Sequence, residues 1–307
     1  MIREFEPADA PALIGLFREI VPEWVLTERG LLHWVDTERE ASRLAVWVAY
    51  EGGRLSGWGE AGIRWEFGKD AAYVFGGVRP DARGRGIGGR LDELAEAHVS
   101  DAARLYSFTV GDDAGRGFLL ARGFREDLAE RISVLDPRTA DSSVLPELEA
   151  AKAADGFRVV SLREVGEQGP ELHWLFETVQ DDAPSSEPLV PIRFEEFRER
   201  FLDNPDLDHD ASAVVLGPDG RAVALSWLLV DREGGRAMVE MTGTLREFRR
   251  RGLARLAKLA TIRWAAEHGI TAMYTGNDTK NRATLALNDG LGFEPRIVHQ
   301  DFVKELH

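Results

Sequence analysis

The chain of 307 residues contains no cysteine, and only five of its basic residues are lysine. The lack of cysteine excludes disulfides, thiolate metal sites and cysteine nucleophiles. No apolar run approaches the roughly 20 residues that span a bilayer, and the acidic N-terminus lacks the pattern of a signal peptide. The seven histidines are scattered, and no His, Asp or Glu spacing suggests a metal site. We therefore expect a cytoplasmic protein that uses no metal.

Acidic residues outnumber basic residues by 53 to 38, which gives a formal net charge of −15. This balance argues against nucleic-acid or anionic-membrane partners and mildly favours a cationic substrate, although an acidic surface also simply keeps a protein in solution. The length and the hydrophobic fraction of 44% suit two globular domains of ordinary size. We expect a monomer or a homodimer.

A stretch rich in glycine and arginine, residues 78–91, joins an expected strand to an expected helix. Its glycines allow backbone N–H groups to converge at a helix start, where the helix dipole favours an anion. The stretch lacks the Gly-Lys-Ser/Thr of a P-loop and the βαβ context of a dinucleotide fingerprint. Such runs also occur in RNA-binding tails, but the position between a strand and a helix favours a diphosphate site. The residues expected to form it are Arg83, Gly84, Arg85, Gly86, Gly88 and Gly89.

The same pattern occurs a second time at residues 244–254. Arg249 repeats Arg83, and the Gly-Phe pair at Gly292 repeats the pair at Gly123 with almost the same displacement along the chain. A nearly constant offset over several landmarks indicates an internal duplication. The second set of expected diphosphate-binding residues is Arg249, Arg250, Arg251, Gly252 and Ala254.

The motif resembles the pyrophosphate-binding motif of the GNAT superfamily, which comprises acetyl-CoA-dependent N-acetyltransferases, and its duplication resembles two GNAT domains in tandem. The resemblance implies an α/β (α+β) fold class in which each half has a mixed, mostly antiparallel central sheet flanked by helices. We expect a first domain at 1–138, a linker at 139–156 and a second domain at 157–307. In this order of elements, each half closes its own sheet with two final strands.

The resemblance also implies how acetyl-CoA, a substrate here, would bind. In GNAT proteins the strand before the phosphate loop is splayed from its neighbour, so the backbones of Val78 and Thr244 would bind the pantetheine chain. The family often places an asparagine after the next strand. Asn277 and Asn281 supply amides there in the second half, whereas the first half offers Asp112 and Gly115.

The family's tyrosine general acid is missing from both halves. Its position, four residues before the closing Gly-Phe, is held by Leu119 in the first half and Asn288 in the second. A leucine cannot donate a proton, and an amide can only hydrogen-bond the leaving thiolate. Departure as a solvated thiolate, or protonation by water or by another residue such as Tyr274, therefore stays open.

Glu240 is the candidate general base. An amine that resembles lysine has a pKa near ~10.4 and is mostly protonated at neutral pH, so a base helps. Strict alternation along the strand would place Glu240 on the same face as Thr242 and Thr244. Related transferases often carry a glutamate base on this strand, where the first half has Val74. The alternative is an ordinary solvated or salt-bridged strand glutamate.

Three functions follow from these features. In the preferred one, the second half acetylates a small primary amine by direct transfer in a ternary complex, and Asp181, Asp182 and Glu187 can attract a cationic acceptor. The missing tyrosines favour the alternative of a non-catalytic acyl-CoA-binding scaffold or sensor. The tandem layout is also similar to that of mycothiol synthase, whose activity lies in its second half, although that half carries the tyrosine that this chain lacks.

Overall fold

A computed structural model describes residues 1–111, 113–166 and 169–306. Contacts divide the chain into two compact units. The first unit comprises Met1–Glu130, Ser185–Pro191 and Ile297–His307, and the second comprises Arg131–Pro184 and Ile192–Arg296. The end of the chain therefore belongs to the first unit. The domain boundaries at 138 and 157 stay predictions.

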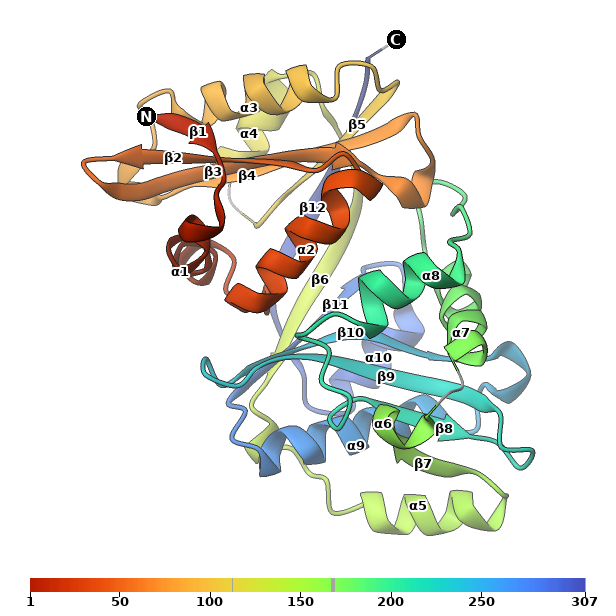
Figure 1. Cartoon of the computed structure of the whole chain (residues 1–307). Helices are drawn as coiled ribbons and strands as arrows, with labels where there is room; N and C mark the ends of the chain where they lie inside the picture. Colours follow the sequence, from red (N-terminus) through yellow and green to blue (C-terminus); the bar gives the residue numbers. More distant parts are fainter. Residues whose placement is uncertain (112, 167–168, 307) are drawn as a thin grey trace. The chain divides into compact units, whose positions relative to one another are not determined.

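The first unit has a mixed sheet with the strand order β1-β2-β3-β4-β5-β12. Helices α1 (Ala10–Ile20) and α2 (Glu28–Ala41) cover one face, and α3 (Ile87–His98) and α4 (Asp113–Ala121) cover the other (Figure 1). Each face has its own core, because the central strands are apolar on both sides. The strands are β1 (Ile2–Glu4), β2 (Ala45–Glu51), β3 (Arg54–Ile63), β4 (Ala71–Val78), β5 (Arg104–Thr109) and β12 (Glu294–Glu305).

The second unit repeats this layout with the strand order β6-β11-β10-β9-β8-β7. Trp227 on β9 is fully buried and packs against Phe176 and Phe197 of the helices on one face. The strands are β6 (Arg125–Leu135, of which residues 131–135 belong to this unit), β7 (Arg158–Ser161), β8 (Ala213–Leu216), β9 (Ala222–Asp231), β10 (Arg236–Thr244) and β11 (Ala272–Asp278). The helices are α5 (Leu145–Ala154), α6 (Leu162–Val165), α7 (Gly169–Asp181), α8 (Phe194–Phe197), α9 (Leu253–Glu267) and α10 (Arg282–Asp289).

The last strand of the chain closes the sheet of the first unit. Strand β12 pairs antiparallel with β5, from Gln300 opposite Thr109 to Glu305 opposite Arg104. Phe302 of β12 is fully buried in the core of the first unit. In the second unit the neighbour of β11 is β6, which comes from the N-terminal half.

The expectation that each half closes its own sheet is therefore wrong. An open sheet edge can pair with any strand of suitable pattern, so the partner is set by the tertiary fold rather than by the local sequence. The fold class itself is confirmed. Both sheets are mixed and mostly antiparallel, with one parallel pair each beside the splayed strands, and helices flank them.

In both units two parallel strands separate just before the phosphate loop. The pairing of β4 with β5 ends at Tyr73 and Tyr106, although β4 continues to Val78. The pairing of β10 with β11 ends at Val239 and Thr275, and β10 likewise continues. A separation of this kind leaves backbone groups for another hydrogen-bonding partner.

Candidate functional site

The first phosphate loop is held by two left-handed glycines. Gly84 has φ 76° and Gly86 has φ 78°, and α3 begins at Ile87 directly after them. Glycine adopts this conformation without steric cost. The turn aims successive N–H groups toward the start of α3, where the helix dipole adds positive potential, and this is the geometry of an anion site.

The second loop has the same backbone conformation. Gly252 has φ 78° before α9, and Arg250 has φ 61° at the position of Gly84. A non-glycine residue in this region costs roughly 1–2 kcal/mol. The loop retains its shape despite that cost, so both halves have the same turn before a helix start.

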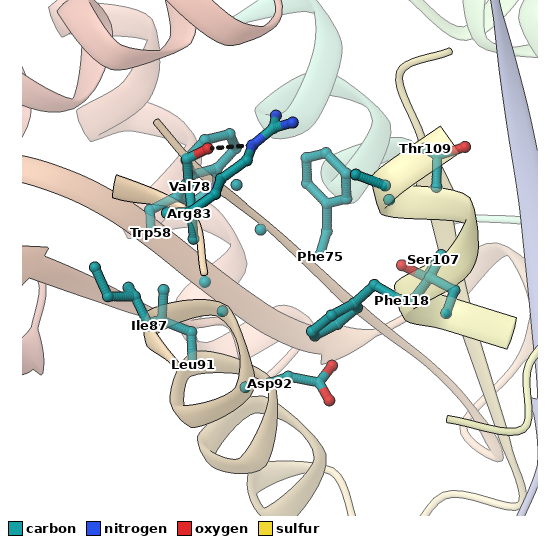
Figure 2. A pocket seen from close by; sticks show the side chains of 18 of the residues that line it. Trp58, Phe75, Val78, Arg83, Ile87, Leu91, Asp92, Ser107, Thr109 and Phe118 are labelled. Carbon is teal, nitrogen blue, oxygen red and sulfur yellow. Dashed lines mark hydrogen bonds between the residues drawn. The ribbon is translucent and has the colours of Figure 1, made fainter. Parts of the chain in front are cut away.

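The arginine that opens each loop ties it back to the preceding strand. Arg83 Nε donates to the Val78 carbonyl oxygen at 3.1 Å, which Figure 2 shows as a dashed line. Arg249 Nε donates to the Thr244 carbonyl oxygen at the same distance of 3.1 Å. The expected loop residues of each half are thus brought together, and the end of each splayed strand is fixed against its loop.

Two other predicted loop arginines turn toward protein groups. Arg85 Nη1 donates to Glu51 Oε2 at 3.0 Å. The Arg251 guanidinium lies 5.6 Å from the centroid of the Phe248 ring. To bind a diphosphate, Arg85 would have to leave Glu51 and Arg251 would have to leave the Phe248 ring.

Asp182 is paired with the second loop. Its carboxylate accepts hydrogen bonds from Arg246 and Arg249, and these bonds lower the pKa of the Asp182 carboxyl. Two arginines neutralise this charge, so the structure gives no support to Asp182 as an attraction for a cationic acceptor. Glu187 belongs to the first unit, where it pairs with Arg104.

A cavity of about 390 Å³ extends from the first loop into the splay between β4 and β5. Ile87, Leu91 and Phe118 form part of its wall, and Phe75 lies at the far side from α3 (Figure 2). A volume of this order is typical of small-molecule sites. The predicted coenzyme residues that line the cavity are Val78, Arg83, Gly84, Gly86, Gly88 and Gly89.

The polar groups in this cavity are few. Asp92, Ser107 and Thr109 line it together with Leu119, the residue at the tyrosine position. Asp92 accepts a hydrogen bond from Arg122, but burial still raises the pKa of its carboxyl. Gly115 also lines the cavity, whereas Asp112 lies outside the described residues.

In the second unit a chain of buried polar groups runs from α9 to β11. Lys258 Nζ donates to Asn288 Oδ1 and, at 3.3 Å, to Thr275 Oγ1. Asn288 Nδ2 then donates to Asn277 Oδ1 at 2.5 Å. Lys258 and Asn288 are fully buried, and burial lowers the pKa of the lysine to about 7.

Sequence reasoning missed Lys258. The available signal was a single lysine in an apolar run of a helix, between Ala257 and Leu259, in a chain with few lysines. The structure also gives Asn281 a local task, because its side chain accepts from the Thr284 N–H at 3.3 Å and caps α10. Its role toward a coenzyme stays a prediction.

Glu240 lies at an irregularity of β10. The register with β9 shifts between Val239 and Met241, so the strict alternation assumed from the sequence does not extend through this residue. Its side chain is exposed, yet the surrounding protein removes part of the water and raises the pKa of the carboxyl. Val74 in the first unit is buried.

No helix within 1–111, 113–166 or 169–306 has both the length and the apolar character needed to cross a bilayer. In the same ranges, no group of three or more His, Asp or Glu side chains is arranged to hold a metal ion.

A search of curated proteins gives no significant match. The chain is similar to the solved structure of a tandem GNAT protein from the clavulanic acid biosynthesis pathway, at 19% identity and a TM-score of 0.74, over 100% of this chain and 98% of that one. It is also similar to a GCN5-related N-acetyltransferase from Sphaerobacter thermophilus, at 16% identity and a TM-score of 0.67, over 100% and 96%. A putative acetyltransferase from Pyrococcus horikoshii matches at 12% identity and a TM-score of 0.59, over 99% and 89%.

These identities show a shared fold. The model of the acetyltransferase (GNAT) family matches residues 13–124 and again residues 173–293, which together make up most of the chain. Each match contains one phosphate loop and one splayed strand. The chain belongs to the GNAT family of acetyltransferases and carries two GNAT domains in tandem.

Proposed function

We propose that the protein is an acetyl-CoA-dependent N-acetyltransferase that acts on a small primary amine by direct transfer in a ternary complex. The observation that carries the proposal is the cavity that leads from the phosphate loop of the first unit into the splay of β4 and β5. A diphosphate at the loop would place an extended pantetheine chain along the unpaired end of β4. The excess of acidic residues supports a cationic acceptor.

We assign the chemistry to the second unit because Glu240 lies at the start of the splayed part of β10. Its raised pKa makes the carboxylate a stronger base than an ordinary surface glutamate. In the reaction the amine nitrogen bonds to the acetyl carbon and gives up a proton to Glu240, directly or through one water. The carbon–sulfur bond breaks, and its electron pair remains on the sulfur of coenzyme A.

A non-catalytic acyl-CoA-binding scaffold is the second candidate. It is favoured by the pairing of Arg249 with Asp182, which a diphosphate at the second loop would have to displace. It is also favoured by Leu119 and Asn288 at the tyrosine positions. A mycothiol synthase-like activity stays a prediction from the tandem layout.

A thiol-release assay with acetyl-CoA and a panel of primary amines tests the proposal. Loss of a general base typically lowers the rate by ~10²–10⁴, so Glu240→Gln is expected to reduce turnover by that order and leave acetyl-CoA affinity nearly unchanged. Glu233→Gln, an exposed carboxylate before β10, is the matched control and should keep full activity. Full activity of Glu240→Gln from about pH 6 to 9 would remove Glu240 from the mechanism. Coenzyme binding without thiol release for any amine would favour the scaffold.

A further inference from the structure

The second unit has a polar network at positions whose counterparts in the first unit line the cavity. We use the name Lys258 network for Lys258, Thr275, Asn277 and Asn288, which are joined by the hydrogen bonds described above. Their counterparts in the first unit are Asp92, Ser107, Thr109 and Leu119, and all four of these line the cavity there.

This correspondence follows from the duplication and from the strand ladders. The same displacement along the chain that relates Arg83 to Arg249 also takes Asp92 to Lys258. Tyr106 pairs with Tyr73, and Tyr274 pairs with Met238, each at the third pair of its ladder. The displacement from Tyr73 to Met238 is one residue shorter than that from Arg83 to Arg249, because the irregularity at Glu240 adds a residue to β10. Thr275 and Asn277 therefore match Ser107 and Thr109. The Lys258 network lies where the coenzyme tail would pass in the second unit.

The ammonium group of Lys258 has only neutral partners among the described residues. Asn288 Oδ1 and Thr275 Oγ1 accept from Nζ, which also lies 4.9 Å from the centroid of the Phe293 ring. No carboxylate pairs with it in the described parts of the chain. A buried cation without a counter-ion is costly, and an anion beside it would gain from the low local dielectric.

Lys258 also fixes the orientation of the amide at the tyrosine position. Because Nζ donates to Asn288 Oδ1, the Nδ2 group of Asn288 must point the other way, toward Asn277. An N–H donor is thereby held at the place where family members carry a hydroxyl, with a positive charge directly behind it.

We propose that Lys258 is a positioning residue for the leaving group, holding Asn288 as a donor and stabilising the thiolate of coenzyme A in place of the missing tyrosine. The inference rests on the proposed chemistry of the second unit. When the carbon–sulfur bond breaks, the electron pair stays on sulfur beside the Asn288 amide and the Lys258 charge. The thiolate then takes its proton from water, so the lysine gives up none.

The pH dependence follows from the neutral surroundings of Lys258. Desolvation alone lowers the pKa of the lysine to about 7, so the positive charge is progressively lost above neutrality. Thr275 and Asn288 do not titrate, and the Phe293 ring does not either. A bound thiolate would raise the lysine pKa again because opposite charges favour each other's ionised forms.

The thiol pKa of bound coenzyme A is the direct test, and it needs no knowledge of the acceptor. The first site is blocked with Gly86→Glu, and coenzyme A is titrated on this chain while the thiolate is followed by its ultraviolet absorbance. We expect the bound thiol pKa to lie about 1–3 units below that of free coenzyme A, as for an acid beside a cation. Lys258→Met, which retains an apolar side chain of similar length, should restore the free value.

Two further variants keep the test decisive. Asn288→Leu introduces leucine, the residue that the first half has at this position, and should raise the thiol pKa of bound coenzyme A as Lys258→Met does. It replaces Lys258→Met as the test if that variant does not fold. Lys280→Met removes an exposed lysine of the same unit and should change nothing. If coenzyme A binds and its thiol pKa is the same in the wild type, Lys258→Met and Asn288→Leu, this inference is overturned and the proposed function is not affected. Loss of all coenzyme binding in Gly86→Glu overturns the assignment of chemistry to the second unit as well.

Discussion

The two phosphate loops have the same backbone conformation, but the space behind them differs. In the first unit a largely apolar cavity follows the loop, and Leu119 stands at the tyrosine position. In the second unit Asn288 stands there, bonded to a buried lysine. A turn that binds phosphate depends on backbone geometry and tolerates new side chains around it, as Arg250 at the place of Gly84 illustrates.

The difference separates two tasks that a coenzyme site performs. Binding the diphosphate needs the loop and the helix start, and both units have them. Stabilising charge beside the thioester needs polar groups in a dry place, and this is the task that we propose for the Lys258 network of the second unit. The comparison therefore favours binding in the first unit and chemistry in the second, and the following predictions test it.

The largest expected effect concerns β12 and β6, the strands that complete the sheets of the two units. Phe302→Ala removes a fully buried ring from the first unit and is expected to cost about 3–5 kcal/mol of the free energy of unfolding. Hydrogen exchange should then rise in β4 and β5. The matched change Ile132→Ala removes a buried side chain of β6 from the second unit and should raise exchange in β10 and β11. The same exchange pattern for both variants would show that the units unfold together.

Coenzyme affinity should respond next. Gly86→Glu forces a side chain into φ 78° and puts a negative charge at the helix start, so acetyl-CoA affinity at the first site should fall by at least about a hundredfold. Gly252→Glu should do the same only at the second site. Calorimetric titration of both variants measures the stoichiometry. An unchanged stoichiometry in Gly86→Glu would mean that the cavity of the first unit binds no coenzyme.

The two units should respond to pH in opposite directions. Burial raises the pKa of Glu60 in the first unit to about 8, so from its ordinary value of 4.5 up to 8 the folded state holds a proton that the unfolded chain has lost. Stability of the first unit therefore falls as pH rises, by roughly 2–3 kcal/mol between pH 5 and 7 at ~1.4 kcal/mol per pH unit.

Lys258 produces the opposite trend in the second unit. Its folded pKa is about 7 against an ordinary value of 10.5, so between these values the unfolded chain holds the extra proton and stability rises with pH. Denaturant unfolding across pH 5 to 10, with Glu60→Gln and Lys258→Met as references, measures both slopes. Wild-type slopes that match those of the variants would mean that these groups titrate normally.

The smallest effect comes from exchanging the residues at the tyrosine position. Asn288→Leu leaves the buried Lys258 amine without its amide acceptor and should cost about 1–3 kcal/mol of the free energy of unfolding. Leu119→Asn places an amide in the wall of a cavity, where water can reach it, and should cost less. Thermal unfolding compares the two variants. A larger loss for Leu119→Asn would mean that the first cavity is dry.

The loops and the fold family could be predicted from the sequence because they depend on short-range geometry. Gly84, Gly86 and Gly252 adopt left-handed conformations that few other residues accept, so their spacing carries the shape of the turn. The repeated offset between Arg83 and Arg249 indicated two copies of one fold, and the family match over both regions confirms that prediction.

Only the tertiary structure decided which strand closes each sheet and what lies behind each loop. Residues 294–305 form strand β12, and the choice of β5 as its partner depends on contacts between segments from opposite halves of the sequence. The bulge at Glu240 and the burial of Lys258 likewise depend on neighbours from other elements. Local preferences act over a few residues, whereas pairing, burial and pKa depend on groups that only the folded chain brings together.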